Sequence, residues 1–330
     1  MAANKKVARR IVLAKDFHGE VTASNFRVEE VQIPALNEGE VQLEALFLTV
    51  DPYMRVWGIK EGELMVGEQV ARVVESRDPK VPVDSIVQAQ AGWTTGSIAK
   101  GSDVIIVADY PSPDWPKSLA IGTLGMPGKT AYFGFLDICK PKAGETVVVS
   151  GAAGAVGAVV GQIAKIKGCR VIGFAGSEAK VQYLKELGFD IALNYKTITD
   201  LDKTLKEVAP EGIDCYFDNV GGEFSSTVLY NMNSFGRVSV CGSITGYNAV
   251  DPPKARMLQP AINRKCLTVT GFMVYNFSDR FDECLRELIQ WVQEGKLKYK
   301  EHVTEGFDNM PKAFMELFSG TNFGKAIVKI

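Results

Sequence analysis

The residues with the clearest chemical potential form a glycine-rich turn. Residues 152–157 read A-A-G-A-V-G, which matches the dinucleotide fingerprint G-x-G-x-x-G with Ala152 in place of its first glycine. In that motif Gly154 lets the backbone approach a pyrophosphate, and Gly157 lets a helix pack closely on a strand. Free N–H groups at the start of the helix then face the anion. We therefore assign to a dinucleotide site Ala152, Ala153, Gly154, Ala155, Val156 and Gly157.

The segment around this turn admits two other interpretations. Residues 146–164 carry no charge and include G-A-V-V-G, so they could form a membrane helix with a small-residue dimer face. Several glycines and Ser150 interrupt such a helix, which argues against it. The segment could also be a buried strand, turn and helix that binds no ligand.

A second group of side chains could donate hydrogen bonds to an oxygen that gains negative charge. Tyr247 follows a predicted strand, at the carboxyl end of a sheet where ligands bind. Tyr53, Arg55 and Tyr275 are further candidates. We assign Tyr53 and Tyr247 to catalysis, and Arg55 and Tyr275 to the substrate. Each tyrosine could instead be a packing residue, and Arg55 could pair with a carboxylate of the fold.

The residues after the second predicted strand bear on the choice of dinucleotide. A chain that selects NAD usually offers an acidic residue there, but this strand ends F-A-G-S at 174–177 and Glu178 falls within the next helix. Lys180 lies in the first turn of that helix, which is unfavourable for a cation unless a phosphate compensates. Lys180 and Tyr195 are therefore candidates for a 2′-phosphate clamp, although Lys180 could simply be solvated.

The elements that must position these residues alternate between strand and helix from Gly125 to about Glu294. This alternation predicts a parallel, doubly wound sheet. A helix is expected from about Ala155 to Gly168, and another over Ser177–Leu187. The predicted strands are Thr146–Ser150, Arg170–Ala175, Asp190–Leu193, Ile213–Phe217, Arg237–Cys241 and Leu267–Gly271.

Residues 1 to about 122 instead read as β-rich, in the manner of a small barrel or sandwich. The tail predicts a helix that Asp308 or Asn309 caps and Gly320 ends, followed by a strand over Lys325–Ile330 that rejoins the first region. The expected strands of that region are Arg10–Leu13, Val28–Ile33, Glu40–Val50, Val70–Glu75, Ile86–Ala89, Ser97–Ala99 and Val104–Val107.

Composition narrows the class of protein. The chain has 330 residues, 46% of them hydrophobic and 23% charged, as in ordinary two-domain globular proteins. A net charge of −2 argues against nucleic acid as a partner. The apolar run after the basic N-terminus is too short for a signal peptide, and no membrane insertion is expected. The six cysteines are spread singly, which fits a reducing cytoplasm.

Motifs across the whole chain resemble the medium-chain dehydrogenase/reductase superfamily, and within it the zinc-free alkenal double-bond reductases. The resemblance implies an α/β fold: a GroES-like β-barrel over residues 1–124, completed by 300–330, and a Rossmann doubly wound parallel sheet over 125–299 that binds NADPH. It also implies a homodimer. The motifs are G-M-P-G-K-T-A-Y (125–132), K-A-G-E-T-V-V-V-S-G-A-A-G-A-V-G (142–157), N-Y-K (194–196), F-D-N-V-G-G (217–222), D-P-Y-M-R (51–55), E-G-F-D-N-M-P-K-A-F (305–314) and N-F-G-K-A-I-V-K-I (322–330).

The resemblance adds residues to the predicted NADPH site, because the family uses the segment that matches C-G-S-I-T-G-Y (241–247) against the cofactor. The stretch 242–264 is long for a loop, and it could be a lid or a mobile connection. The added residues are Asn219, Cys241, Gly242, Ser243, Ile244, Thr245, Gly246, Tyr247, Phe272, Met273, Val274 and Asn322.

No metal site is expected. Zinc relatives carry G-H-E where this chain has V-G-E-Q at 66–69, and His18 and His302 lack further ligands at useful spacing. Hydride removal from an alcohol needs zinc or a base to stabilise an alkoxide. Hydride addition to the β-carbon of an enone leaves a delocalised enolate, which one or two neutral donors can hold. A metal-free site therefore favours reduction of a C=C bond conjugated to a carbonyl.

The leading hypothesis is therefore an NADPH-dependent reductase of α,β-unsaturated ketones and aldehydes, including 15-oxo-prostaglandins and lipid alkenals. The resemblance also implies that the chain could have leukotriene B4 12-hydroxydehydrogenase activity. Two alternatives stay open. One is an NADPH quinone reductase, and the other is a non-catalytic NADPH-binding protein similar to the lens crystallins of this superfamily.

Overall fold

The computed structural model describes residues 6–107, 110–112, 114–251 and 253–330. The chain forms two compact units. One comprises residues 1–122, 301–322 and 326–330, and the other comprises residues 123–300 and 323–325. Each unit has its own sheet and is described separately.

The second unit is built on a six-stranded sheet in which every adjacent pair of strands is parallel. The spatial order is β10-β9-β8-β11-β12-β13. The strands of this sheet are apolar and mostly buried, because helices cover both faces of a parallel sheet. The strands are β8 (Thr146–Val149), β9 (Arg170–Ala175), β10 (Ile191–Asn194), β11 (Ile213–Asp218), β12 (Met232–Val240) and β13 (Thr268–Gly271).

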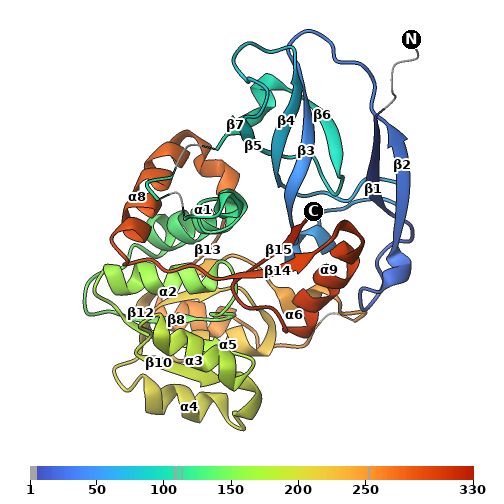
Figure 1. The fold of residues 1–330 in the computed structure, drawn as a ribbon. Helices are drawn as coiled ribbons and strands as arrows, with labels where there is room; N and C mark the ends of the chain where they lie inside the picture. Colours follow the sequence, from blue (N-terminus) through green and yellow to red (C-terminus); the bar gives the residue numbers. More distant parts are fainter. Residues whose placement is uncertain (1–5, 108–109, 113, 252) are drawn as a thin grey trace, which may run out of the picture. The chain divides into compact units, whose positions relative to one another are not determined.

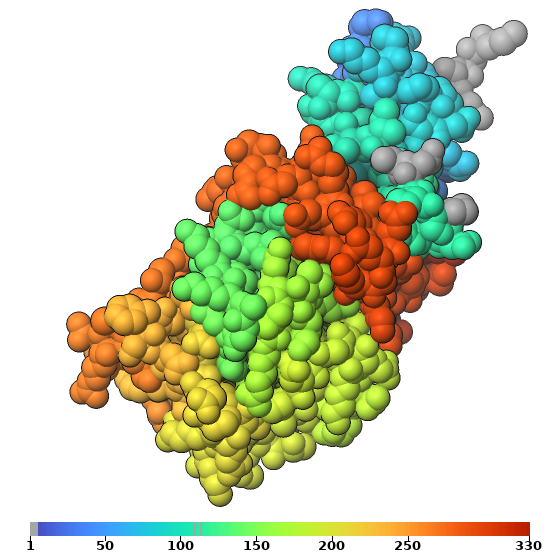
Figure 2. Space-filling model, turned by 90° about the vertical axis from the view of Figure 1, so that its left-hand side faces the viewer, coloured from blue at the N-terminus to red at the C-terminus, as the bar shows by residue number. Residues whose placement is uncertain are grey.

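Helices connect and cover these strands (Figure 1). In Figure 2 the orange-red atoms of α8 lie beside the green atoms of α1, where the hydroxyl of Tyr132 donates to Glu283 at 3.2 Å. A π-helix, η5 (Gly134–Cys139), directly follows α1. The helices are α1 (Met126–Phe133), α2 (Gly157–Ile166), α3 (Glu178–Glu186), α4 (Leu201–Val208), α5 (Gly222–Tyr230), α6 (Ile244–Tyr247), α7 (Gln259–Lys265) and α8 (Phe281–Gln293), with the short helices η6 (Tyr195–Thr197) and η7 (Val274–Arg280).

The first unit is a β domain with one C-terminal helix. Its larger sheet has the order β14-β15-β3-β4-β5-β7, with β6 also paired to β3, while β1 and β2 form a separate antiparallel pair. The elements are β1 (Val7–Leu13), β2 (Phe26–Gln32), β3 (Glu40–Thr49), β4 (Gln69–Ser76), β5 (Ile86–Ala89), β6 (Gly96–Lys100), β7 (Val104–Ile106), β14 (Glu301–Glu305), α9 (Met310–Ser319) and β15 (Lys325–Lys329), with the short helices η1 (Ala23–Asn25), η2 (Pro52–Arg55), η3 (Gly101–Asp103), η4 (Lys117–Ile121) and η8 (Phe307–Asn309).

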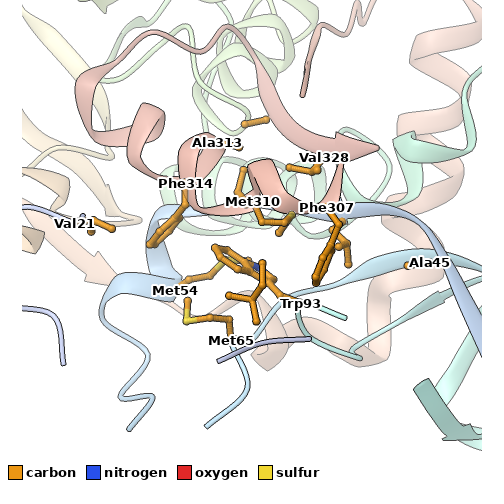
Figure 3. Packing of buried hydrophobic residues seen from close by; sticks show 14 of the residues in the cluster. Val21, Ala45, Met54, Met65, Trp93, Phe307, Met310, Ala313, Phe314 and Val328 are labelled. Atoms are coloured by element: carbon orange, nitrogen blue, oxygen red, sulfur yellow. The ribbon is translucent and has the colours of Figure 1, made fainter. Parts of the chain in front are cut away.

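Helix α9 closes the core of the first unit. Figure 3 shows Phe314 and Met310 of this helix facing Trp93, Met54 and Met65, and all five side chains are buried. The rings of Phe314 and Trp93 meet edge to face with centroids 5.6 Å apart. Such pairs are favourable beyond the apolar area that they bury. The C-terminal helix is therefore part of the first unit's core.

The predicted α/β class, with a β-rich first region and a parallel sheet after it, is confirmed. The tail strand also rejoins the first region, since β15 pairs antiparallel with β3. Several element bounds were wrong; β1, for example, begins at Val7 rather than Arg10. Helix α2 begins at Gly157 rather than Ala155, because residues 151–156 form turns. Strand β12 begins at Met232 rather than Arg237, because Met232 already pairs with Ile213 of β11. The register then shifts, and the next paired residues are Cys215 and Arg237.

Within the described residues, no helix combines the length and the apolar character that a membrane crossing requires. The segment 146–164, for which a membrane helix was an alternative, is a strand, a turn and a helix.

Phe314→Ala should destabilise the first unit. Deleting a fully buried phenylalanine costs about 3–5 kcal/mol in the free energy of unfolding. The control is Val83→Ala, since Val83 is 50% exposed and exposed substitutions change stability by less than about 0.5 kcal/mol. Urea unfolding of both variants and the wild type measures the difference. Equal stability of the two variants would contradict this account of the core.

Candidate functional site

The predicted cofactor residues gather at the carboxyl edge of the parallel sheet. In the order β10-β9-β8-β11-β12-β13, the chain leads from β8 outward to β9 and β10, then returns to place β11 on the other side of β8. The carboxyl ends of β8 and β11 therefore flank a topological switch point, where open α/β sheets bind their ligands. The glycine turn follows β8, and Asn219 follows β11.

Close backbone packing shapes the glycine turn. Gly151 has a φ of 58°, a left-handed conformation that favours glycine. A Cβ atom on Gly157 would lie 2.5 Å from the carbonyl oxygen of Gly151, so only glycine fits there. Ala152 occupies the position of the first fingerprint glycine, and its N–H donates to the carbonyl of Phe174 at 3.0 Å. The altered fingerprint thus still forms the close turn that a dinucleotide site requires.

The C-terminal tail contributes to this turn, which sequence reasoning missed. The N–H of Gly324 donates to the carbonyl of Ala153 at 2.9 Å, and Gly154 and Gly324 form a parallel bridge. Asn322, which was assigned to the cofactor by resemblance, lies two residues before Gly324. The only signal in the sequence was the glycine in N-F-G-K at 322–325.

Basic side chains gather beyond β9 and β10. The hydroxyl of Ser177 accepts the N–H of Lys180 at 3.3 Å and caps α3. Burial, and then the charge of Lys196, lowers the pKa of Lys180. A Cβ atom on Gly176 would lie 3.1 Å from the Tyr195 hydroxyl and 3.4 Å from Cε of Lys196. Tyr195 and Lys196 therefore lie beside the residue that leads into the capped start of α3, where Lys180 is found. Lys196 is an additional cation that sequence reasoning did not assign.

The ring of Phe323 lies close to two lysines of the second unit. Lys180 Nζ lies 5.7 Å from the centroid of the Phe323 ring, and Lys300 Nζ lies 4.8 Å from the same centroid. Glu178, the nearest acidic alternative, accepts the side-chain amide of Asn194 at 2.8 Å. A dianionic phosphate would relieve the mutual repulsion of the lysines. The residues present thus fit a dinucleotide that carries a 2′-phosphate.

The segment 241–247 is attached to the loop after β11. The backbone N–H of Cys241 donates to the carbonyl of Asp218 at 2.8 Å, and Thr245 Oγ1 donates to the carbonyl of Val220 at 2.7 Å. Tyr247 folds back over its own segment, where its hydroxyl accepts the N–H of Ser243 at 3.4 Å. Burial is the main reason why the pKa of Tyr247 is raised. Its hydroxyl therefore stays protonated at neutral pH and can act as a hydrogen-bond donor.

Residues 272–275 follow β13 and are anchored by aromatic packing. A Cβ atom on Gly134 would lie 2.2 Å from Cζ of Phe272, so the π-helix comes very close to this ring. Phe277 of η7 stacks on Phe133 with centroids 4.8 Å apart and an interplanar angle of 5°. Of the predicted residues here, Val274 is buried, whereas Met273 and Tyr275 are exposed.

Tyr53 and Arg55 belong to the first unit, on the short helix η2. The Tyr53 ring meets Trp57 edge to face with centroids 5.2 Å apart. Arg55 donates to the carbonyl of Gly19 at 3.2 Å, and its guanidinium lies 4.9 Å from the Phe17 ring centroid. Burial lowers the pKa of Arg55. Arg55 thus also has a structural function, since it holds the loop before residue 20.

Among the described residues, no three His, Cys, Asp or Glu side chains are grouped so that they could hold a metal ion. The stretch V-G-E-Q at 66–69 contains the buried Glu68, which accepts the side-chain amide of Gln90 at 3.3 Å. The expectation that no metal takes part in the chemistry stays a prediction.

Comparison with known proteins shows the family. A family profile described as the N-terminal domain of oxidoreductase matches residues 9–107, and one described as zinc-binding dehydrogenase matches residues 155–294. Over 326 residues the chain is 55% identical to prostaglandin reductase 1 of Bos taurus, covering 98% of this chain and 99% of that protein. The chain belongs to the prostaglandin reductase 1 family.

Two further relatives are similar over nearly the whole chain. The NADP+-dependent 2-alkenal reductase of Nicotiana tabacum is 39% identical, covering 99% of this chain and 98% of that protein. The structure of CurA from Vibrio vulnificus in complex with NADPH is 39% identical with a TM-score of 0.91, covering 97% of this chain and 98% of that one. The resemblance inferred from the motifs is confirmed.

Lys180→Ala should weaken NADPH binding selectively. Losing a hydrogen bond to a charged group costs about 1.5–3 kcal/mol, or roughly tenfold to a hundredfold in Kd, whereas NADH binding should be nearly unchanged. The matched control is Lys185→Ala, since Lys185 is exposed on the same helix. Titration calorimetry of the wild type and both variants with NADPH and NADH measures the six dissociation constants. An equal loss for NADPH and NADH would remove Lys180 from the phosphate site.

Proposed function

We propose that the chain catalyses the NADPH-dependent reduction of the C=C bond of α,β-unsaturated ketones and aldehydes. The observation that carries this proposal is the glycine turn at the sheet's switch point, together with the lysines beyond β9 and β10. Near-full-length similarity to prostaglandin reductase 1 and 2-alkenal reductase supports the same reaction. NADPH is the cofactor, and it supplies the hydride that is added to the β-carbon.

We assign NADPH binding and substrate binding to different domains, as the sequence predicts. Residues 125–299 form the NADPH-binding domain, in which the turn 152–157 holds the pyrophosphate and Lys180 with Tyr195 holds the 2′-phosphate. Residues 1–124, completed by 300–330, form the substrate and catalytic domain. The remaining assignments place Asn219, residues 241–247, residues 272–274 and Asn322 at the cofactor.

Neutral donors suit the charge that develops in this reaction. Hydride addition to the β-carbon moves negative charge onto the carbonyl oxygen, and hydroxyl groups aimed at that oxygen stabilise the enolate. Tyr247 and Tyr53 are the proposed donors, and the raised pKa of Tyr247 keeps its proton available at neutral pH. Arg55 and Tyr275 are proposed to contact the substrate.

Lipid enones and alkenals are the proposed substrates within this class. The support is the apolar surface of the segment after β12, where Val250 is 64% and Met257 is 70% exposed. Met257 and Leu258 would contact an acyl chain. A steady-state panel of alkenals, 15-oxo-prostaglandins and quinones with NADPH tests the substrate class. Efficient turnover of quinones alone would replace this proposal by a quinone reductase.

Isotope transfer tests the reaction itself. With an enone and NADPH deuterated on the transferred face, deuterium should appear at the β-carbon and the α-hydrogen should come from solvent. Mass spectrometry and NMR of the product measure both positions. Deuterium on the carbonyl carbon, which gives an allylic alcohol, would refute conjugate addition. Tyr247→Phe and Tyr53→Phe then identify the hydrogen-bond donor. Turnover should fall in the variant that has lost the donating hydroxyl.

A homodimer is the proposed assembly, and β13 is the proposed contact. This strand lies at one edge of the six-stranded sheet, and its side chains are largely exposed. Edge strands with unpaired backbone groups readily pair with another chain.

A charge on β13 should therefore dissociate the dimer. Val269→Lys is expected to halve the molecular mass measured by light scattering after size-exclusion chromatography. The control is Val303→Lys on β14, a terminal strand of the larger sheet of the first unit, where the mass should not change. A monomeric wild type, or a Val269→Lys protein that keeps its dimer mass, would contradict the proposal.

The cytoplasm is the proposed location, where the six free cysteines stay reduced.

A further inference from the structure

A buried carboxylate lies at the switch point of the parallel sheet. Asp218 is the last residue of β11 and is 5% exposed. Its Oδ1 atom accepts the hydroxyl of Tyr216 at 2.9 Å and the backbone N–H groups of Val220 and Gly221, each at 2.9 Å. The hydroxyl of Ser150 lies 3.3 Å from the same oxygen. One carboxylate oxygen thus organises the loop that follows its own strand.

Ser150 extends this network to the glycine turn. It is the residue before Gly151, and its Oγ accepts the N–H of Asn219 at 3.0 Å. Its carbonyl accepts the side-chain amide of Asn219 at 2.7 Å. The hydroxyl of Tyr216 also lies 3.2 Å from Ser150 Oγ. The first residue of the turn is therefore held against the loop after β11.

The backbone of the same loop holds the segment after β12. The Asp218 carbonyl accepts the N–H groups of Cys241 at 2.8 Å and Gly242 at 3.1 Å. The Val220 carbonyl accepts both the N–H of Thr245, at 3.2 Å, and its hydroxyl, at 2.7 Å. The loop after β11 therefore links two other segments that are proposed to bind NADPH, the glycine turn and the segment 241–247.

We propose that Asp218 is a positioning residue for NADPH: its carboxylate, with the Tyr216 hydroxyl, fixes the turn 150–157, the loop 219–222 and the segment 241–247 relative to one another. This inference rests on the proposed assignment of these segments to the cofactor. Bonds to an ionised acceptor are about twice as strong as neutral ones. A site that is already ordered loses less entropy when its ligand binds, so preorganisation raises affinity.

The protonation of the network agrees with this role. Burial, and then the charge of Asp218, raises the pKa of Tyr216 well above its usual range. The hydroxyl therefore keeps its proton at physiological pH and donates to the carboxylate. Ser225 Oγ lies 2.8 Å from the Tyr216 hydroxyl and is a further polar neighbour in the same buried cluster.

The same strand supplies a matched control. Asp214 lies near the amino end of β11, where its carboxylate accepts the N–H of Thr146 at 2.9 Å and the side-chain amide of Asn233 at 2.8 Å. It makes the same kind of bond between neighbouring strands, but at the edge of the sheet opposite to the predicted NADPH site. Asp214 variants therefore measure the loss of an aspartate bond between strands of this sheet at a place away from the predicted NADPH site.

The experiment compares Asp218→Ala, Asp218→Asn and Tyr216→Phe with Asp214→Ala and Asp214→Asn. Asp218→Ala should raise the Kd for NADPH roughly tenfold to a hundredfold, since it leaves buried donors unpaired. It should also speed amide exchange at 219–222 and 241–247 in the cofactor-free protein. Asp218→Asn should show smaller changes in both measurements than Asp218→Ala, because its amide oxygen still accepts hydrogen bonds. Tyr216→Phe should change both in the same direction but less.

The Asp214 variants should lower stability in urea while the Kd for NADPH stays within about twofold of wild type. The proposal is overturned if Asp214→Ala raises the Kd as much as Asp218→Ala does. It is also overturned if Asp218→Ala folds and binds NADPH as the wild type does. Should Asp218→Ala not fold, Asp218→Asn and Tyr216→Phe decide by the same two readouts. A wild-type protein that does not bind NADPH would instead overturn the proposed function.

Discussion

The second unit depends on the close approach of helix α2 to the sheet, which its glycines make possible. A Cβ atom on Gly161 would lie 1.9 Å from the ring of Phe189, and one on Gly173 of β9 would lie 2.6 Å from the same ring. The Phe189 side chain thus fills the space that two missing Cβ atoms leave between helix and strand. Gly157 allows the same closeness at the start of the helix. Protein interiors are packed densely enough that no larger residue fits at these positions.

This packing explains why the apolar run was ambiguous in the sequence. The spacing G-A-V-V-G at 157–161 suits a contact between two membrane helices as well as one between a helix and a sheet. The partner of Gly161 is Phe189, which lies 28 residues further along the chain, and local periodicity contains no information about such a pair. The alternation of strands and helices over the following residues is what pointed to a sheet.

Local signals predicted the parts of the site that depend on local structure. The fingerprint at 152–157 located the turn, and the cation in the first turn of α3 pointed to the cluster around Lys180. The network of Ser150 and Asp218 could not be found in this way, because these residues are 68 positions apart and meet only through the return of the chain to the other side of β8. The pairing of Gly324 with the turn is equally non-local. The motif F-D-N-V-G-G (217–222) contains Asp218, but nothing in the motif indicates a partner for this aspartate.

The charges along the carboxyl edge of the sheet are unevenly distributed, which has a physical consequence. Lys180, Lys196 and Lys300 lie beyond β9 and β10, whereas the buried charge between β8 and β11 is the carboxylate of Asp218. A dinucleotide with a 2′-phosphate carries its excess negative charge at the adenosine end. The lysines beyond β9 and β10 would attract that end. The lysines thus favour the proposed orientation, in which the 2′-phosphate lies beyond β9 and β10 and the pyrophosphate lies at the glycine turn.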